Sequence, residues 1–179
     1  MEERKIYILL TEFPDTGTKF IKALTGLKYP HASIGLDEDM NTFYSFVTKG
    51  FIVESVNRYV KPNRSPFPCQ LYELNVPEAT YFKIKEALDL FVEFKELLHY
   101  SKLGVALSIL HLPYKRNHFG FFCSQFVAFL LEQSKAVNLS KSSNRYFSDD
   151  LRKLKGMRLK YQGNLKNMID CFNIKPCLA

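Results

Sequence analysis

The segment Phe121–Leu131 constrains the fold of this chain most, because it is almost entirely apolar and follows a glycine. Phe126, Val127 and Leu130 lie three, four and seven residues after Cys123, which is the spacing of one helical face. An apolar helical face must be covered by another layer of secondary structure. We therefore expect a helix over about residues 122–133, with Cys123 near its N-terminus and directed toward a sheet.

The first half of the chain has the pattern of antiparallel strands. The runs His31–Leu36 and Thr42–Val47 flank the polar segment Asp37–Asn41, which predicts a β-hairpin. In the register that this turn implies, Leu36 opposes Thr42 and Ser33 opposes Ser45. Further strands are predicted at Lys5–Thr11, Phe51–Val56, Gln70–Val76 and Arg158–Gln162.

Helices are predicted between and after these strands. One starts at Asn75, which would act as its N-cap, and it presents an apolar stripe. The others cover Thr16–Thr25, Leu103–Leu112 (expected to be buried) and Ser148–Lys155. Lys61–Pro68 is predicted to be a loop, and the residues after Gln162 an irregular tail. The order predicts a single α+β domain over residues 1–179, with mostly hairpin-connected strands.

Composition excludes several classes of protein. With 46% hydrophobic and 15% aromatic residues, the chain is not disordered. No apolar run has the roughly 20 residues of a membrane span, and the short run after Met1–Lys5 does not match a secretory signal, so we expect a cytoplasmic protein. The net charge is +7, concentrated at Lys115–Arg116 and Arg152–Lys160. No nucleic-acid-binding motif accompanies this charge, although a basic nucleic-acid binder stays an alternative that salt dependence would test.

The four cysteines do not have the spacing of a disulfide scaffold or a zinc site. No Cys-x-x-Cys occurs, and no histidine lies near Cys171 or Cys177 in the sequence. We expect reduced thiols, no metal and no cofactor.

Cys123 is the candidate nucleophile, since the positive end of a helix dipole favours a thiolate. His31, which opens its strand, is the candidate base. On the expected hairpin, Ser45 lies diagonal to His31 on the same face, where its hydroxyl could orient the imidazole. A slip of one residue would present Tyr44 instead. His118, in a basic loop before the cysteine helix, is interpreted as a rival base, a substrate contact or an exposed loop residue.

The string Cys123–Val127, Cys-Ser-Gln-Phe-Val, resembles the nucleophile motif of papain-like thiol hydrolases of the NlpC-type superfamily. The histidine precedes the cysteine, as in the circularly permuted branch that includes YiiX-like bacterial proteins and the lecithin:retinol acyltransferase group. Tyr44-Ser45-Phe46 and Tyr161-Gln162-Gly163 are further points of likeness, and the chain is similar over nearly its whole length to uncharacterised bacterial proteins of this type.

This resemblance implies a permuted papain-like fold, an antiparallel sheet packed against helices. It also implies Cys123 as nucleophile, His31 as base and Ser45 as third member. The third residue of such sites is usually His, Asn, Gln or a carboxylate, so Glu54 on the next strand is a substitute candidate.

The function that we expect is hydrolysis of a peptide or amide bond through a Cys–His dyad and a thioester acyl-enzyme. One alternative is a lipid acyltransferase or esterase of the same fold, and another is a non-catalytic binding module. The expected partner is an amide- or ester-containing substrate. The sequence contains no signal that identifies this substrate or the oligomeric state.

Overall fold

The computed structural model describes residues 2–13, 21–23, 25–36, 40–59, 67–110 and 120–172. These residues form an α+β fold built on a six-stranded sheet with the order β4-β3-β2-β1-β5-β8, in which every neighbouring pair is antiparallel. The predicted α+β class is therefore confirmed. The strands are β1 (Glu3–Thr11), β2 (His31–Leu36), β3 (Thr42–Val47), β4 (Gly50–Ser55), β5 (Pro68–Pro77) and β8 (Arg158–Asn164).

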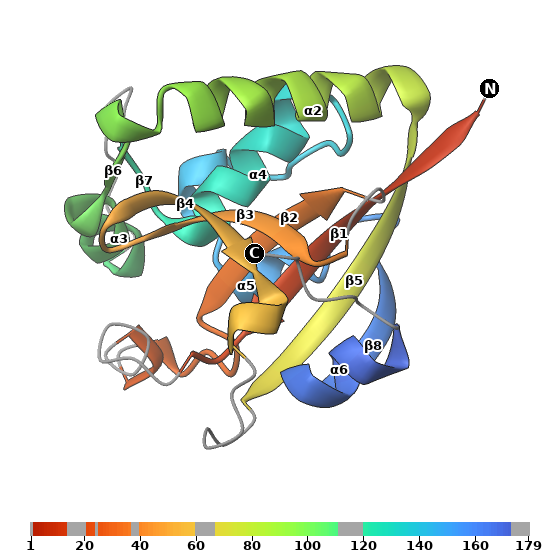
Figure 1. Cartoon of the computed structure of the whole chain (residues 1–179). Helices are drawn as coiled ribbons and strands as arrows, with labels where there is room; N and C mark the ends of the chain where they lie inside the picture. The colour runs from red at the N-terminus through yellow and green to blue at the C-terminus, as the bar shows by residue number, and fades with distance from the viewer. Residues whose placement is uncertain are drawn as a thin grey trace.

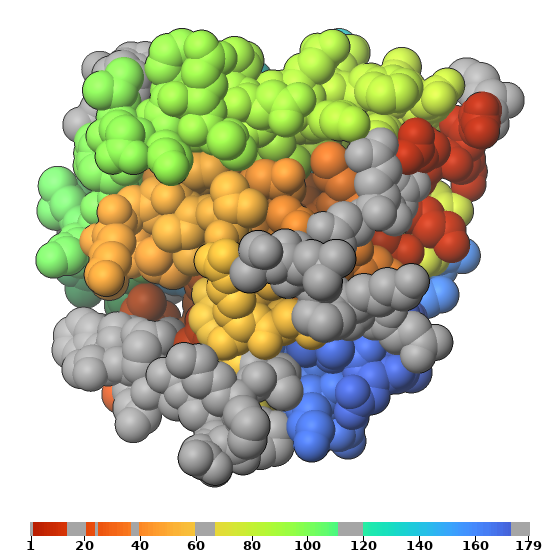
Figure 2. Space-filling view, viewed as in Figure 1, coloured from red at the N-terminus to blue at the C-terminus, as the bar shows by residue number. Residues whose placement is uncertain are grey.

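The helices lie on both faces of this sheet (Figure 1). They are α2 (Glu78–Glu93), α3 (Lys102–Ile109), α4 (Cys123–Gln133), α5 (Ser148–Leu151) and α6 (Leu165–Cys171). Three short 3-10 turns are also present: η1 (Val56–Tyr59) after β4, η2 (Lys95–Leu97) after α2 and η3 (Ser143–Arg145) after α4. A small parallel pair is formed by β6 (His99–Tyr100), which precedes α3, and β7 (Gly120–Phe121), which comes immediately before α4. Figure 2 shows α2 along one side of the molecule, above β3 and β4, with α6 at the opposite end. No helix in the described part of the chain is long and apolar enough to cross a membrane.

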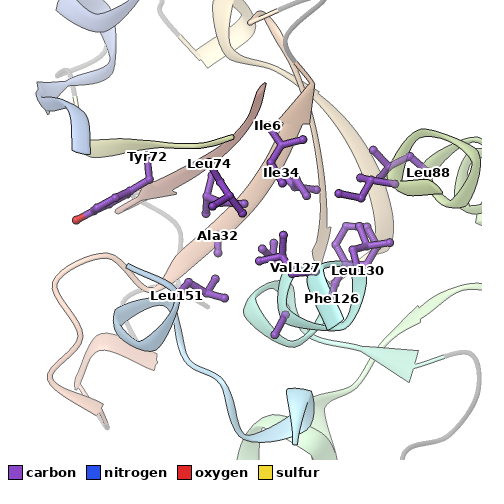
Figure 3. Close-up of a cluster of buried hydrophobic side chains, with 14 of the residues drawn as sticks. Ile6, Ala32, Ile34, Tyr72, Leu74, Leu88, Phe126, Val127, Leu130 and Leu151 are labelled. Atoms are coloured by element: carbon purple, nitrogen blue, oxygen red, sulfur yellow. The ribbon is translucent and has the colours of Figure 1, made fainter. Parts of the chain in front are cut away.

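Strand alternation divides the apolar residues into two cores. Ala32 and Ile34 of β2 pack with α2 and α4, where Val127 and Leu130 lie against the strand (Figure 3). The opposite face of the sheet packs on α6 and η1, with Phe43, Leu71 and Met168 among its members. The helix α4 is buried along most of its length, more fully than its predicted single apolar face required.

The predicted hairpin is confirmed, with Ile34 opposite Tyr44 and Gly35 opposite Phe43. This is the expected register, and it has a packing consequence at Gly35. A Cβ at this position would come within 2.8 Å of the Phe43 ring, so the cross-strand ring requires a glycine.

The predicted start of the helix after Gln70–Val76 is wrong. Strand β5 continues to Pro77, because β1 pairs with it as far as Glu3 opposite Pro77. Helix α2 begins at Glu78, with Pro77 as its N-cap residue. The side chain of Asn75 is not a cap; it donates to Glu3 and accepts from Arg158.

Two other predictions were wrong. The segment after Ser101 is helical, but α3 is not a buried helix: Leu103 is 69% exposed, and only Gly104 and Ser108 are buried. The expected irregular tail begins instead with α6, which Asn164 caps by accepting from the Asn167 amide. Most of the predicted helix Thr16–Thr25 and of the predicted loop Lys61–Pro68 lies outside the described residues.

Candidate active site

Cys123 is the first residue of α4, placed there by a change in backbone conformation. Phe122 before it is extended, with φ −111° and ψ 163°, and the helix begins at the next residue. The Cys123 side chain is buried, and its Sγ lies 3.7 Å from the carbonyl oxygen of Pro30, the residue before β2. The end of the helix that carries the thiol therefore meets the beginning of the strand that carries His31.

His31 is the first residue of β2 and is held between groups from several elements. Its Nε2 lies 2.8 Å from Oε1 of Glu54 on β4, and both side chains are almost fully buried. The Phe13 ring lies against the imidazole, with ring centroids 4.7 Å apart. These contacts fix both the position of the ring and the role of Nε2.

His31 also interacts with the Cys123 side chain. Burial by itself lowers the pKa of His31, but the charge of Glu54 and a hydrogen bond with the Cys123 side chain raise it, to a net value of about 10. Since Nε2 is occupied by Glu54, Nδ1 is the ring nitrogen left for the thiol. The structure thus brings together Cys123 and His31, which lie 92 positions apart in the chain.

Ser45 makes a different hydrogen bond from the one expected. Its hydroxyl donates to the carbonyl oxygen of Ala32 at 2.7 Å, so its only proton is used by the backbone. Tyr44 is opposite Ile34, on the side of the first core, and does not share the face of His31. The group at the far nitrogen of His31 is Glu54, which had been considered only as a substitute.

Glu54 reaches His31 across an intervening strand. It is paired with Phe43 of β3, and β3 in turn lies beside β2. The Glu54 side chain thus joins β4 to β2, two strands that are not neighbours in the sheet. Its Oε2 is buried and has no hydrogen-bond partner among the described residues.

Two buried hydroxyls with no partner in the described part of the chain lie near this pair. Thr11 is the cross-strand partner of His31, and Ser33 is the next residue on the same face of β2. The predicted hairpin register placed Ser33 on this face, whereas the sequence pattern did not point to Thr11. Only the β1–β2 register, with Thr11 opposite His31, identifies it.

The described residues include three other cysteines and histidines, which have different surroundings. Cys69 is fully buried in the second core, with its Sγ 4.0 Å from the Met168 sulfur, and burial raises its pKa to about 12. Cys171 is a free, exposed thiol. His99 is exposed on β6, and His118, His111 and Cys177 lie outside the described residues.

The basic segment Arg152–Lys160 is directed largely toward acidic side chains. Arg158 and Lys160 lie 2.8 Å and 3.7 Å from the carboxylate of the buried Glu73, and Lys5 lies 3.3 Å from it. Arg152 pairs with Asp149. This charge is therefore at least partly neutralised within the fold.

The geometry has the elements of nucleophilic catalysis: a thiol at a helix N-terminus, an imidazole in contact with it, and a carboxylate on the far nitrogen. Within the described ranges, no group of three or more His, Cys, Asp or Glu side chains could hold a metal ion. No protein-family model matches the chain, and no curated protein matches it significantly.

Proposed function

We propose that this chain is a thiol hydrolase of permuted papain-like fold that cleaves an amide or ester bond through a thioester on Cys123. The observation that carries this proposal is the position of His31, which contacts both the Cys123 thiol and the buried Glu54 carboxylate. A buried imidazole with a carboxylate on one nitrogen and a thiol on the other can hold and transfer one proton in a fixed direction. In this proposal Glu54, rather than Ser45, is the positioning residue.

Acylation follows from this arrangement. At neutral pH, His31 carries the proton, since its pKa is raised to about 10. The Cys123 sulfur attacks the substrate carbonyl carbon, a C–S bond forms, and the carbonyl electron pair moves to oxygen. When this pair returns, the bond to the leaving nitrogen or oxygen breaks, and His31 gives its proton to the leaving group.

Deacylation uses the same groups in the reverse roles. Once sulfur is acylated, the contribution of the Cys123 side chain to the raised pKa of His31 is lost. The imidazole then takes a proton from water as water attacks the thioester carbonyl, and the thiol leaves. If the hydroxyl group of a lipid or the amino group of an amine attacks in place of water, the same site acts as an acyltransferase.

The test is the reactivity of Cys123 in the full chain. We expect iodoacetamide to alkylate Cys123 faster than the exposed Cys171, although Cys123 is only 5% exposed. We also expect p-nitrophenyl acetate to acetylate Cys123, seen as a mass increase on its peptide and as a burst of p-nitrophenolate. In His31→Ala, both rates should fall.

Cys171→Ser is the matched control and should leave the burst unchanged. Alkylation of Cys123 no faster than that of Cys171, together with no acetyl group on Cys123, would refute the enzyme proposal and leave a non-catalytic binding module. Once acetylation is established, adding candidate amines or alcohols separates hydrolysis from acyl transfer.

A further inference from the structure

The N-terminus of α4 is not capped in the usual way. The N-cap residue is Phe122, whose side chain has no acceptor, whereas Ser, Thr, Asp and Asn are the usual N-caps. The first amides of a helix have no partner within the helix, and they carry the positive end of its dipole. Here these amides surround Cys123, the first helical residue.

Gln125 folds back over this helix end. Its Oε1 accepts from the backbone N–H of Phe122 at 3.3 Å. This bond sets the orientation of the carboxamide, because a flipped amide would place the Nε2 donors against another donor. Both ends of the carboxamide therefore lie at the first turn of the helix, with Nε2 forced to be the end that faces away from Phe122.

The Nε2 group of Gln125 has no hydrogen-bond partner among the described residues, although the residue is 0% exposed. Leaving a buried donor unsatisfied costs about 1–3 kcal/mol. An apolar residue would avoid this cost but would lose the acceptor for the Phe122 N–H, whereas a glutamate would keep the acceptor and carry no unsatisfied donor. A glutamine at this place is explained if the donor is satisfied when a ligand is bound.

We propose that Gln125 is a catalytic residue, and that its Nε2–H donates to the carbonyl oxygen of the acyl group attached to Cys123. This inference rests on the proposed function. As the C–S bond forms, the carbonyl electron pair moves to this oxygen, and Nε2–H together with the Cys123 backbone N–H stabilises the negative charge. No proton moves to the oxygen, and the charge disappears when the leaving group departs.

The burial of Gln125 matches that of the reacting groups. Cys123 and His31 are each 5% exposed. Any substrate that reaches the thiol must displace what shields Cys123, and in doing so it brings a carbonyl oxygen to the end of α4 where Gln125 also lies. A donor in such a water-poor site is worth more than one in solvent.

Gln125→Glu is the decisive variant. A glutamate keeps the oxygen that accepts from the Phe122 N–H, as in a capping box, and suits the helix N-terminus, but it has no N–H donor. We expect the rate constant for acetylation of Cys123 by p-nitrophenyl acetate to fall about 10²-fold, with little change in KM and with no loss of thermal stability. Gln125→Ala, which lacks the cap as well, should lose both acetylation and stability.

Alkylation by iodoacetamide gives the matching control, because this reaction attacks an sp³ carbon and forms no oxyanion. At a pH where the alkylation rate no longer rises in either protein, Gln125→Glu should be alkylated at the wild-type rate. An acetylation rate within threefold of wild type, or a loss of alkylation equal to the loss of acetylation, would overturn the inference while leaving the thiol hydrolase intact. Absence of acetylation in the wild-type protein would instead refute the proposed function, and this inference with it.

Discussion

Two buried carboxylates in this molecule have opposite surroundings. Glu54 is beside one buried histidine and leaves its second oxygen without a partner among the described residues. Glu73 is equally buried, yet Lys5 of β1 and Arg158 and Lys160 of β8 surround it with cations that remain 40–58% exposed. Tyr7 donates to it as well.

The difference distinguishes the structural ion cluster at Glu73 from the proposed reactive site at Glu54 and His31. The cations around Glu73 keep much of their hydration and join β1, β5 and β8, so the cluster satisfies its carboxylate at modest cost. Glu54 and His31 lose nearly all contact with water, and one oxygen of Glu54 has no partner in the part of the chain that the structure describes. Such an arrangement stabilises the fold poorly for what it costs, which is typical of functional sites.

The largest difference should appear on removing each charge. In Glu54→Gln the strongest influence that raises the pKa of His31 is lost, while the shape of the side chain is kept. We expect the rate of Cys123 acetylation to fall about 10²–10³-fold, with a change in its pH profile. Glu73→Gln is the matched variant and should stay within threefold of wild type. Equal losses in the two variants would break the comparison.

The two carboxylate sites should also give opposite pH dependences of stability. The pKa of His31 is raised from 6.5 to about 10, so its contribution is complete below about pH 6.5 and is lost as the pH rises toward 10. Burial raises the pKa of Glu73, but the interactions with Lys5, Lys160 and Arg158 lower it by more, so that the pKa lies below its ordinary value. Its contribution is therefore present above about pH 4.5 and is lost as the pH falls.

Urea unfolding across pH 4 to 10 measures both effects. The alkaline decrease in the free energy of unfolding should be on the order of a few kcal/mol and should be absent in His31→Asn. The acid decrease should be reduced in Glu73→Gln. An unchanged alkaline slope in His31→Asn would contradict the assignment of that decrease to His31.

At neutral pH, Glu73→Gln should lower the free energy of unfolding by about 1–2 kcal/mol, because its partners are half in water and can be rehydrated. Glu3→Gln is the control, since Glu3 accepts from Asn75 at the surface and should matter by less than about 0.5 kcal/mol. A loss of acetylation in Glu73→Gln, with stability unchanged, would assign Glu73 to the site instead.

The smallest effect is expected at Ser45. Ser45→Ala removes its hydrogen bond to the Ala32 carbonyl, which should cost about 1 kcal/mol and change acetylation less than threefold. A loss of acetylation comparable to that of Glu54→Gln would restore Ser45 as the third member of the site.

Much of the fold could be predicted from local pattern. The alternation at His31–Leu36 and Thr42–Val47, with a polar turn between them, specified a hairpin and its register. The spacing in Phe121–Leu131 specified a helix with Cys123 at its start. The exposure of α3 could not be predicted, because an apolar run has the same pattern whether its large or its small residues are buried.

The start of α2 was predicted wrongly, and Ser45 rather than Glu54 was expected at the far nitrogen of His31, for a related reason. Asn75 has the features of an N-cap, but pairing with β1 extends β5 past it. Ser45 is the nearer candidate on the hairpin, but reach depends on side-chain length as well as register. Glu54 is one strand farther away, but its longer side chain brings Oε1 to the His31 ring.

The sequence by itself determined most of the described strands and helices, and that a thiol begins an apolar helix, because periodicity is a local property of the chain. The tertiary structure alone decided that Glu54 faces His31, that Ser45 bonds to the backbone, and that the Gln125 donor at the start of α4 has no partner among the described residues. These outcomes depend on strand order, on distances across the sheet and on exclusion of water, which arise only when distant segments pack together.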